Sequence, residues 1–214
     1  QADDPSFMHQ EAAQAISDYH TTNPVDMVVY VGDMATDEVS HHDGVKTDFF
    51  DNLPSEVPWK VVHGNHDYLN DTDWNNKYPH PKQHTFELGD YGFIITDTGD
   101  PNDSTNYLCA DYQFVKDSID GFSSKKGVVV FQHIPPYADS FDELGADCPD
   151  IRDQYARDEV LGVVVGHHHN INTTYEAYGS RYLYSVRIGY HHLNSYETGL
   201  APFDDYGFRI IELP

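Results

Sequence analysis

Several side chains that can bind metals or transfer protons follow short apolar segments of this 214-residue chain. Carboxylate, amide and imidazole donors together suit borderline transition metals such as Mn, Fe or Zn. Alternate residues of an extended segment face the same side, so the two histidines near residue 168 can reach one cluster. The sequence therefore predicts a metal centre built from several segments. Its candidate residues are Asp33, Asn65, His66, Asp67, His133, His167 and His169.

The apolar segments before these residues are short and rich in β-branched side chains, which is typical of buried strands. Ligand sites in α/β sheets gather outside the carboxyl ends of the strands, so neighbouring strands would bring these side chains into one crevice. The two oxygens of Asp33 would allow it to bridge two ions about 3.5–4 Å apart, a spacing that suits in-line displacement. The expected strands are Val25–Val31, Trp59–His63, Phe93–Thr96, Gly127–Gln132, Val160–Val165, Tyr182–Val186 and Tyr206–Glu212.

Segments long enough for helices separate several of these strands. The clearest are Phe7–Tyr19, Asp111–Phe122 and Asp150–Arg157. The alternation of strands and helices predicts a layered α/β fold. Because no linker, repeat or low-complexity segment interrupts the chain, we expect residues 1–214 to form a single domain.

Four motifs occur in a fixed order between Val25 and His169: Gly32-Asp33, Gly64-Asn65-His66-Asp67, His133, and Gly166-His167-His168-His169. In their order and spacing they resemble the motifs of the calcineurin-like metallophosphoesterases. The resemblance implies an α/β fold of four layers, a β-sandwich flanked by helices. It also implies an enzyme with two divalent or trivalent transition-metal ions, Mn, Fe or Zn. Such a hydrolase would cleave a phosphomonoester or a phosphodiester with a metal-activated hydroxide.

The resemblance also implies a role for each metal ligand. Asp33 would bridge the two ions. Asn65, His133 and His167 would complete one metal site, and His169 would belong to the other.

The same motifs imply two catalytic residues outside the ligand set. His66 would stabilise the transition state or protonate the leaving oxygen, and Asp67 would orient His66 through a hydrogen bond. Other histidines follow expected strands as well. For His41 and His42 we favour a position in a solvated loop. For His191, a solvated loop and a place in the phosphate pocket are equally favoured.

The motif with which the family usually opens, Asp-x-His, is missing. Asp18-Tyr19-His20 matches it superficially, but only eleven residues separate His20 from Gly32. That is too short for the crossover that a parallel strand pair needs. The opening strand is therefore expected before Gln1. Either that strand is absent from this chain or the second metal site is incomplete, unless Gln1 is a remnant of the motif.

Acidic residues dominate the composition, with 36 Asp and Glu against 12 Lys and Arg and a formal net charge of −24. This charge excludes non-specific nucleic-acid binding and adhesion to an anionic bilayer. No apolar run is long enough to span a membrane. The acidity fits either adaptation to high salt or secretion at mildly acidic pH.

The compartment signals favour a secreted glycoprotein. Acceptor sequences for N-glycosylation occur at Asn70, Asn102 and Asn172. Cys109 and Cys148 allow one disulfide or two free thiols. Two other functions stay open beside the enzyme: a catalytically retired phosphoesterase fold used as an extracellular binding or structural module, and a metal-storage protein.

Overall fold

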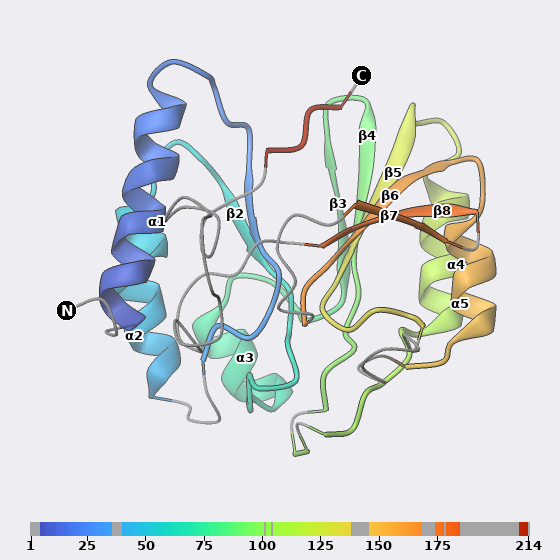
Figure 1. Ribbon diagram of the computed structural model, residues 1–214, viewed down its shortest axis with the longest axis horizontal. Helices are drawn as coiled ribbons and strands as arrows, with labels where there is room; N and C mark the ends of the chain where they lie inside the picture. Colours follow the sequence, from blue (N-terminus) through green and yellow to red (C-terminus); the bar gives the residue numbers. More distant parts are fainter. Residues whose placement is uncertain are drawn as a thin grey trace, which may run out of the picture.

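The computed structural model describes residues 5–35, 40–100, 102–103, 105–137, 146–167, 174–177, 179–184 and 210–213. Two sheets lie face to face between two groups of helices, which gives four layers (Figure 1). The expected β-sandwich flanked by helices is therefore confirmed. The helices are α1 (Pro5–His20), α2 (His41–Asp48), α3 (Asp71–Lys77), α4 (Tyr112–Gly121) and α5 (Pro149–Tyr155), with a 3-10 turn at Phe50–Asn52.

The smaller sheet pairs β1 (Val28–Tyr30) with β2 (Trp59–Val61) in parallel. The larger sheet has the strand order β3-β4-β5-β6-β8-β7. The four inner strands β4, β5, β6 and β8 are parallel to one another. The edge strands β3 and β7 pair antiparallel with β4 and β8, respectively. Its strands are β3 (His84–Leu88), β4 (Tyr91–Ile95), β5 (Gly127–Gln132), β6 (Val160–Val165), β7 (Thr174–Ala177) and β8 (Ser180–Tyr184).

The central strand β5 shows why the larger sheet is covered on both faces. Every residue of β5 is buried. Val128 and Val130 pack into the core under α4 and α5, whereas Val129 and Phe131 pack into the core between the sheets. Because successive side chains of a strand point to opposite faces, a strand with apolar residues at every position needs cover on both sides.

The helices bury one apolar face each. In α4, Val115 and Ile119 are four residues apart and fully buried against the larger sheet. The Asp111 side chain caps this helix by accepting a hydrogen bond of 2.9 Å from the backbone N of Phe114. A third core lies between the smaller sheet and α1 and includes Ala13, Ile16 and Val61.

Most of the expected elements are present, with boundaries shifted by a few residues. The last expected strand is wrong in part: residues 206–209 lie outside the described residues, and 210–212 carry no strand. The helices α2 and α3 and the edge strands β3 and β7 were not expected. Asp18 and His20 belong to α1, as their rejection as an opening motif requires.

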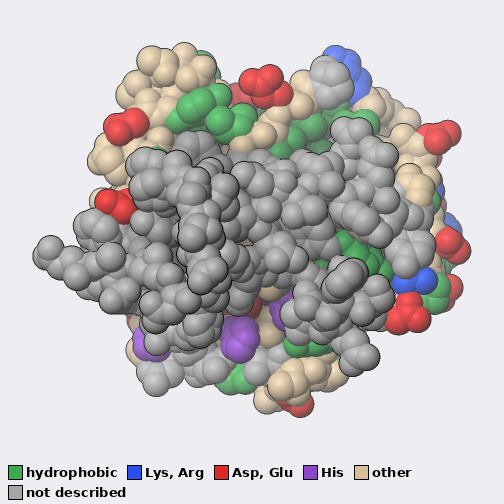
Figure 2. Space-filling view, viewed as in Figure 1, with side chains coloured by type: hydrophobic (Ala, Val, Ile, Leu, Met, Phe, Trp, Pro, Cys, Tyr) green, Lys and Arg blue, Asp and Glu red, His purple; other side chains and the backbone are tan. Residues whose placement is uncertain are grey.

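The outer surface is mixed in character. On the face drawn in Figure 2, acidic side chains are spread around the rim, and histidine side chains gather in its lower part. Among the described residues, no helix is long and apolar enough to cross a membrane.

Candidate metal centre

The centre lies where strands of both sheets end. Asp33 follows β1 and His167 follows β6, and each has a positive φ, 54° and 65° respectively. Residues other than glycine rarely adopt this conformation, which costs about 1–3 kcal/mol and persists only where the surrounding structure enforces it. Two such residues within one cluster make it the candidate functional site.

The pair His133 and Asp33 is the clearest test of whether a metal fits. His133 Nδ1 lies 2.7 Å from the carbonyl oxygen of Val31, which only accepts, so Nδ1 donates its proton there. His133 Nε2 then faces Asp33 Oδ2 at 3.0 Å. A neutral imidazole would point its lone pair at the carboxylate, so the pair requires a cation between them, either a proton or a metal ion. A ligand histidine typically gives its other N–H to a backbone carbonyl in this way.

The electrostatics of this pair agree with that requirement. Burial disfavours the charged form of Asp33, but the His133 imidazole and the backbone hydrogen bond from His66 outweigh it and hold the pKa of Asp33 below its ordinary value. Burial likewise opposes a charge on His133, yet the Asp33 carboxylate raises the pKa of His133 above its ordinary value. Each partner therefore favours the charged form of the other.

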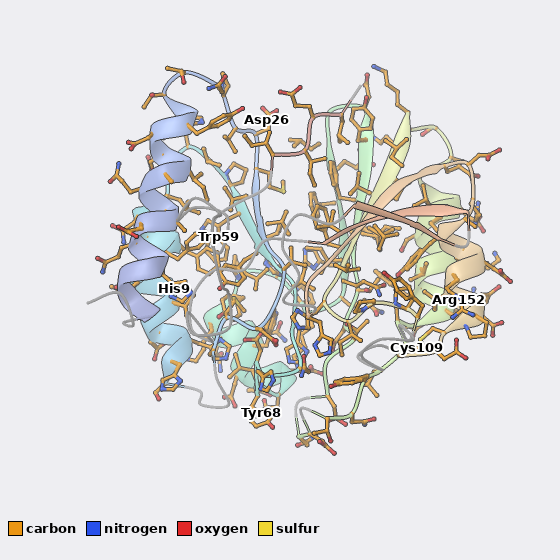
Figure 3. All side chains as sticks on the ribbon, viewed as in Figure 1. His9, Asp26, Trp59, Tyr68, Cys109 and Arg152 are labelled. Atoms are coloured by element: carbon orange, nitrogen blue, oxygen red, sulfur yellow. A yellow bond between two sulfur atoms is a disulfide. The ribbon has the colours of Figure 1, made fainter. Side chains whose placement is uncertain are left out.

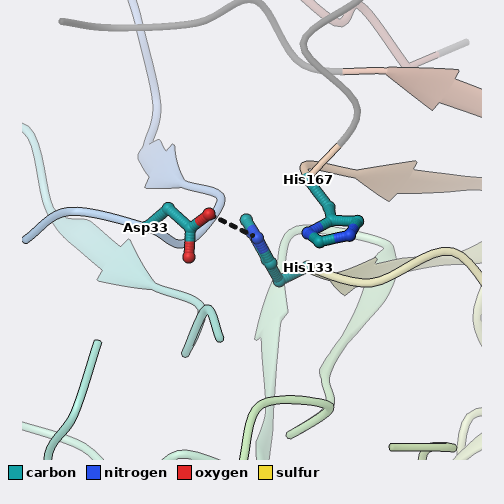
Figure 4. Close-up of side chains that lie close together, drawn as sticks. All are labelled: Asp33, His133 and His167. Carbon is teal, nitrogen blue, oxygen red and sulfur yellow. Dashed lines mark ion pairs between the residues drawn. The ribbon is translucent and has the colours of Figure 1, made fainter. Parts of the chain in front are cut away.

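His167 and Asn65 complete the cluster. One ligand atom from each of Asp33, His133 and His167 lies within 4.8 Å of the others (Figure 4). His167 Nδ1 lies 3.0 Å from Asn65 Oδ1. Ions bound at about 2.1 Å bring their ligand atoms to within about 4 Å of each other, so small movements of side chains would place these donors on one ion.

The structure brings four of the five predicted ligands together, and the fifth lies outside the described residues. Asp33, Asn65, His133 and His167 form the cluster, and the backbone N of His66 donates to Asp33 Oδ1 over 2.9 Å. The fifth ligand, His169, lies outside the described residues, as do Gln1 and His191. The assignment of each ligand to one ion or the other stays a prediction.

Asp67 makes contacts that the sequence did not predict. Its carboxylate is fully buried and accepts hydrogen bonds from the backbone N of Ala35, at 3.0 Å, and of Gly64, at 2.9 Å. Burial raises the pKa of Asp67, although His42 nearby opposes this. Asp67 thus ties the loop after β1 to the loop after β2, and its predicted hydrogen bond to His66 stays a prediction.

Sequence reasoning missed the pair His63 and Asp97. His63 is fully buried, with Nδ1 2.7 Å from Asp97 Oδ1 and Nε2 3.1 Å from the carbonyl oxygen of Asp67. Both partner atoms are oxygens that can accept a hydrogen bond, so the His63 ring links Asp97 to the backbone of the Asn65 loop. The available signal was the place of Asp97, directly after an apolar strand like the other candidates.

The expectation of a solvated His42 is wrong. Its side chain is buried in α2, where Nδ1 lies 2.7 Å from the Tyr78 hydroxyl. Burial lowers the pKa of His42, although Asp67 opposes this. Its Nε2 lies 4.0 Å from Asp67 Oδ1, so this histidine packs behind the centre. His41, one residue earlier, is exposed as expected.

Two glycines allow the loops to approach each other closely. Gly32 has a φ of 84°, and a Cβ there would overlap the His133 ring. A Cβ on Gly64 would overlap the backbone and the carboxylate of Asp33. Only glycine fits at either position without moving a candidate ligand.

Comparison with known proteins agrees with this geometry. The family model of the calcineurin-like phosphoesterases matches residues 7–170, which include the whole described cluster. This chain belongs to the calcineurin-like phosphoesterase family. Membership implies bound metal ions and metal-dependent hydrolysis of phosphoesters in general.

A solved structure and the curated proteins give two further findings. A dimetal phosphatase from Danio rerio has the same fold, with a TM-score of 0.66 and 13% sequence identity over 84% of this chain and 77% of that one. At that identity the likeness concerns the fold alone. None of the curated proteins matches this chain significantly in sequence.

Proposed function

We propose that this protein is a dinuclear-metal hydrolase that cleaves phosphomonoesters or phosphodiesters. The observation that supports this most directly is the approach of His133 Nε2 to Asp33 Oδ2 at 3.0 Å, with Nδ1 already committed to the backbone. Two acceptors held face to face in a buried site need a cation between them. Of the two candidates, a proton and a metal ion, membership of the calcineurin-like phosphoesterase family supports the metal ion. We propose that this ion is Mn, Fe or Zn.

In such a centre some residues would bind the ions and His66 would act on the substrate. Asp33 would hold both ions, with Asn65, His133 and His167 on one of them and His169 on the other. When bound, the ions would polarise the phosphoryl group and supply a nucleophile at neutral pH. The backbone N–H of His66 keeps one Asp33 oxygen oriented at 2.9 Å. The imidazole of His66 would protonate the leaving oxygen or stabilise the charge that develops there.

The first experiment measures metal content and hydrolysis together. Protein purified without chelator or nickel resin should contain about two transition-metal ions per chain by elemental analysis. p-Nitrophenyl phosphate and bis(p-nitrophenyl) phosphate would then separate the monoesterase from the diesterase. Two ions without hydrolysis of either ester would favour a retired fold that serves as a binding module. More than two ions without hydrolysis would favour metal storage.

A variant of His66 tests the catalytic assignment separately from the metals. His66→Ala should lower kcat about 10²–10⁴-fold because a proton donor is lost, while metal content stays at the wild-type value. His20→Ala is the matched control, because His20 ends α1 and contacts Glu56 at 3.4 Å. A kcat equal to that of wild type would remove His66 from the mechanism.

We also propose that the protein acts outside the cytosol. Cys109 and Cys148 form a disulfide, which is typical of oxidising compartments. Asn70 and Asn102 are exposed and accessible to glycosylation, whereas Asn172 lies outside the described residues. Protein from its natural source should lose mass at Asn70 or Asn102 on treatment with a peptide N-glycosidase. An unmodified mass at Asn70, Asn102 and Asn172 would contradict the proposal of a glycoprotein.

A further inference from the structure

The imidazole of His167 is held from two sides by aromatic rings. Its ring centroid lies 4.8 Å from that of Tyr107 at an interplanar angle of 72°, and 5.4 Å from that of His133 at 77°. Both contacts are edge-to-face, a favourable arrangement for aromatic rings. His167 also carries a strained φ of 65°. The orientation of this candidate ligand therefore depends on what packs against it, and Tyr107 supplies one side.

Tyr107 is itself held firmly. It pairs with Gly99 in an isolated antiparallel bridge, and the next residue, Leu108, donates its backbone N to Thr98 O over 3.2 Å. The Tyr107 ring packs against the core beneath α4 and α5. The backbone bridge and the packing of the ring thus fix the position of Tyr107 next to His167.

Tyr107 belongs to the loop between Thr98 and Cys109. Both ends of this loop are attached to the segment that follows His133. At one end, Thr98 Oγ1 accepts a hydrogen bond of 3.0 Å from the backbone N of Ile134. At the other end, Cys109 is joined by a disulfide to Cys148, whose backbone N donates to Pro136 O over 3.2 Å (Figure 3). The loop therefore connects the segment behind one candidate ligand, His133, to the ring of another.

We propose that Tyr107 is a positioning residue of the metal centre, which orients the His167 imidazole, and that the Cys109–Cys148 disulfide holds Tyr107 in place. The inference rests on the proposed function, because it requires a metal at His167. A ligand that is already oriented loses less conformational freedom when the metal binds. An edge-to-face contact between aromatic rings changes an equilibrium constant about 2–12-fold when it is removed.

Metal affinity in the absence of substrate tests this proposal. Metal-free protein would be titrated with Co²⁺ against a chelating dye, and the visible spectrum of bound Co²⁺ would report the ligand set. Tyr107→Ala should weaken Co²⁺ binding about 5–10-fold and alter the spectrum, because His167 loses the ring that orients it. Tyr107→Phe keeps the ring edge and should bind Co²⁺ within about twofold of wild type. Tyr112→Ala, at a tyrosine that is 43% exposed, is the matched control.

A double-mutant cycle separates positioning from a general loss of packing. If Tyr107 acts through His167, Tyr107→Ala should have no further effect on Co²⁺ affinity in a His167→Ala background. An equal loss in both backgrounds, or wild-type affinity for Tyr107→Ala, would overturn the inference while leaving the proposed function intact. Wild-type protein that binds no metal would instead overturn the proposed function.

The disulfide is tested in the same way. The paired change Cys109→Ser and Cys148→Ser should weaken Co²⁺ binding in the wild-type background and leave it unchanged when Tyr107 is already alanine. Equal losses in both backgrounds would show that the disulfide does not act through Tyr107. Should the paired variant fail to fold by circular dichroism, the cycle between Tyr107 and His167 decides the proposal by itself.

Discussion

His63 Nδ1 lies 2.7 Å from Asp97 Oδ1, and this ion pair joins the two sheets directly behind the metal centre. His63 follows β2 of the smaller sheet and Asp97 follows β4 of the larger one. The other nitrogen of His63 donates to the carbonyl oxygen of Asp67. The pair thereby sets the position of the loop that carries Asn65 and His66.

Removal of the charge on Asp97 should therefore weaken the whole structure. Asp97→Asn takes the carboxylate away from the buried His63 ring, and a hydrogen bond to a charged group is worth about 1.5–3 kcal/mol. We expect the free energy of unfolding in urea to fall by about 2 kcal/mol. Asp117→Asn, on the exposed face of α4, should change it by less than about 0.5 kcal/mol. Equal effects of both substitutions would argue against a structural ion pair.

Asp67 offers a direct test between the contacts seen and the role predicted from sequence. Asp67→Asn replaces one carboxylate oxygen with a donor that faces a backbone N–H, which should lower the free energy of unfolding by about 1–3 kcal/mol. Denaturant unfolding measures this loss. If Asp67 acts mainly by orienting His66, kcat would fall instead while the unfolding free energy stays at the wild-type value.

The close approach of Gly64 to Asp33 predicts that a substitution of this glycine weakens metal binding. A Cβ at residue 64 would overlap Asp33, so Gly64→Ala should displace this ligand and weaken metal binding about 10-fold or more. Gly44→Ala is the matched control, because nothing lies within 4 Å of a Cβ in that helix position. Gly44→Ala should raise the free energy of unfolding by about 0.5–1 kcal/mol. Unchanged metal affinity in Gly64→Ala would contradict the close packing of these loops.

The buried His80 and the half-buried His84 predict instability in acid. Burial lowers the pKa of His80 and of His84 from 6.5 to about 4. Between these pH values the unfolded chain binds more protons than the folded one, so the free energy of unfolding should fall as the pH drops from 6.5 to 4. His84→Asn keeps a donor near Pro81 O and removes one titrating ring. Urea unfolding from pH 7 to pH 4 should show a shallower decline for this variant, and an identical decline would refute the assignment.

The disulfide should also contribute to stability independently of the metal. Cys109 and Cys148 are 39 residues apart in the chain, and closing a loop of that length in the unfolded state is worth about 4 kcal/mol. We expect the paired serine variant to have a correspondingly lower free energy of unfolding in metal-free buffer. Reduction of the wild-type protein should reproduce this loss, and equal stability of both forms would contradict it.

Much of the fold follows from local patterns. The runs that form β5 and β6 are rich in valine and carry apolar side chains on both faces, so they favour burial on both sides. Helix α1 was predictable from its alanine-rich stretch, and α4 from its cap at Asp111. The helices α2 and α3 escaped prediction because both are short and polar. Burial of their own side chains, His42 and Val45 in α2 and Trp74 in α3, stabilises them rather than helix propensity.

The amino-acid sequence by itself determined which side chains are available to the centre. It placed Asp33, Asn65, His133 and His167 after apolar strands in an order that identifies the family. Only the tertiary structure decided how they meet, because the contact of His133 with Val31 spans 102 residues and joins two sheets. Tertiary packing alone also made partners of His63 and Asp97, and of Tyr107 and His167. Such contacts depend on how layers stack, which no local pattern of side chains encodes.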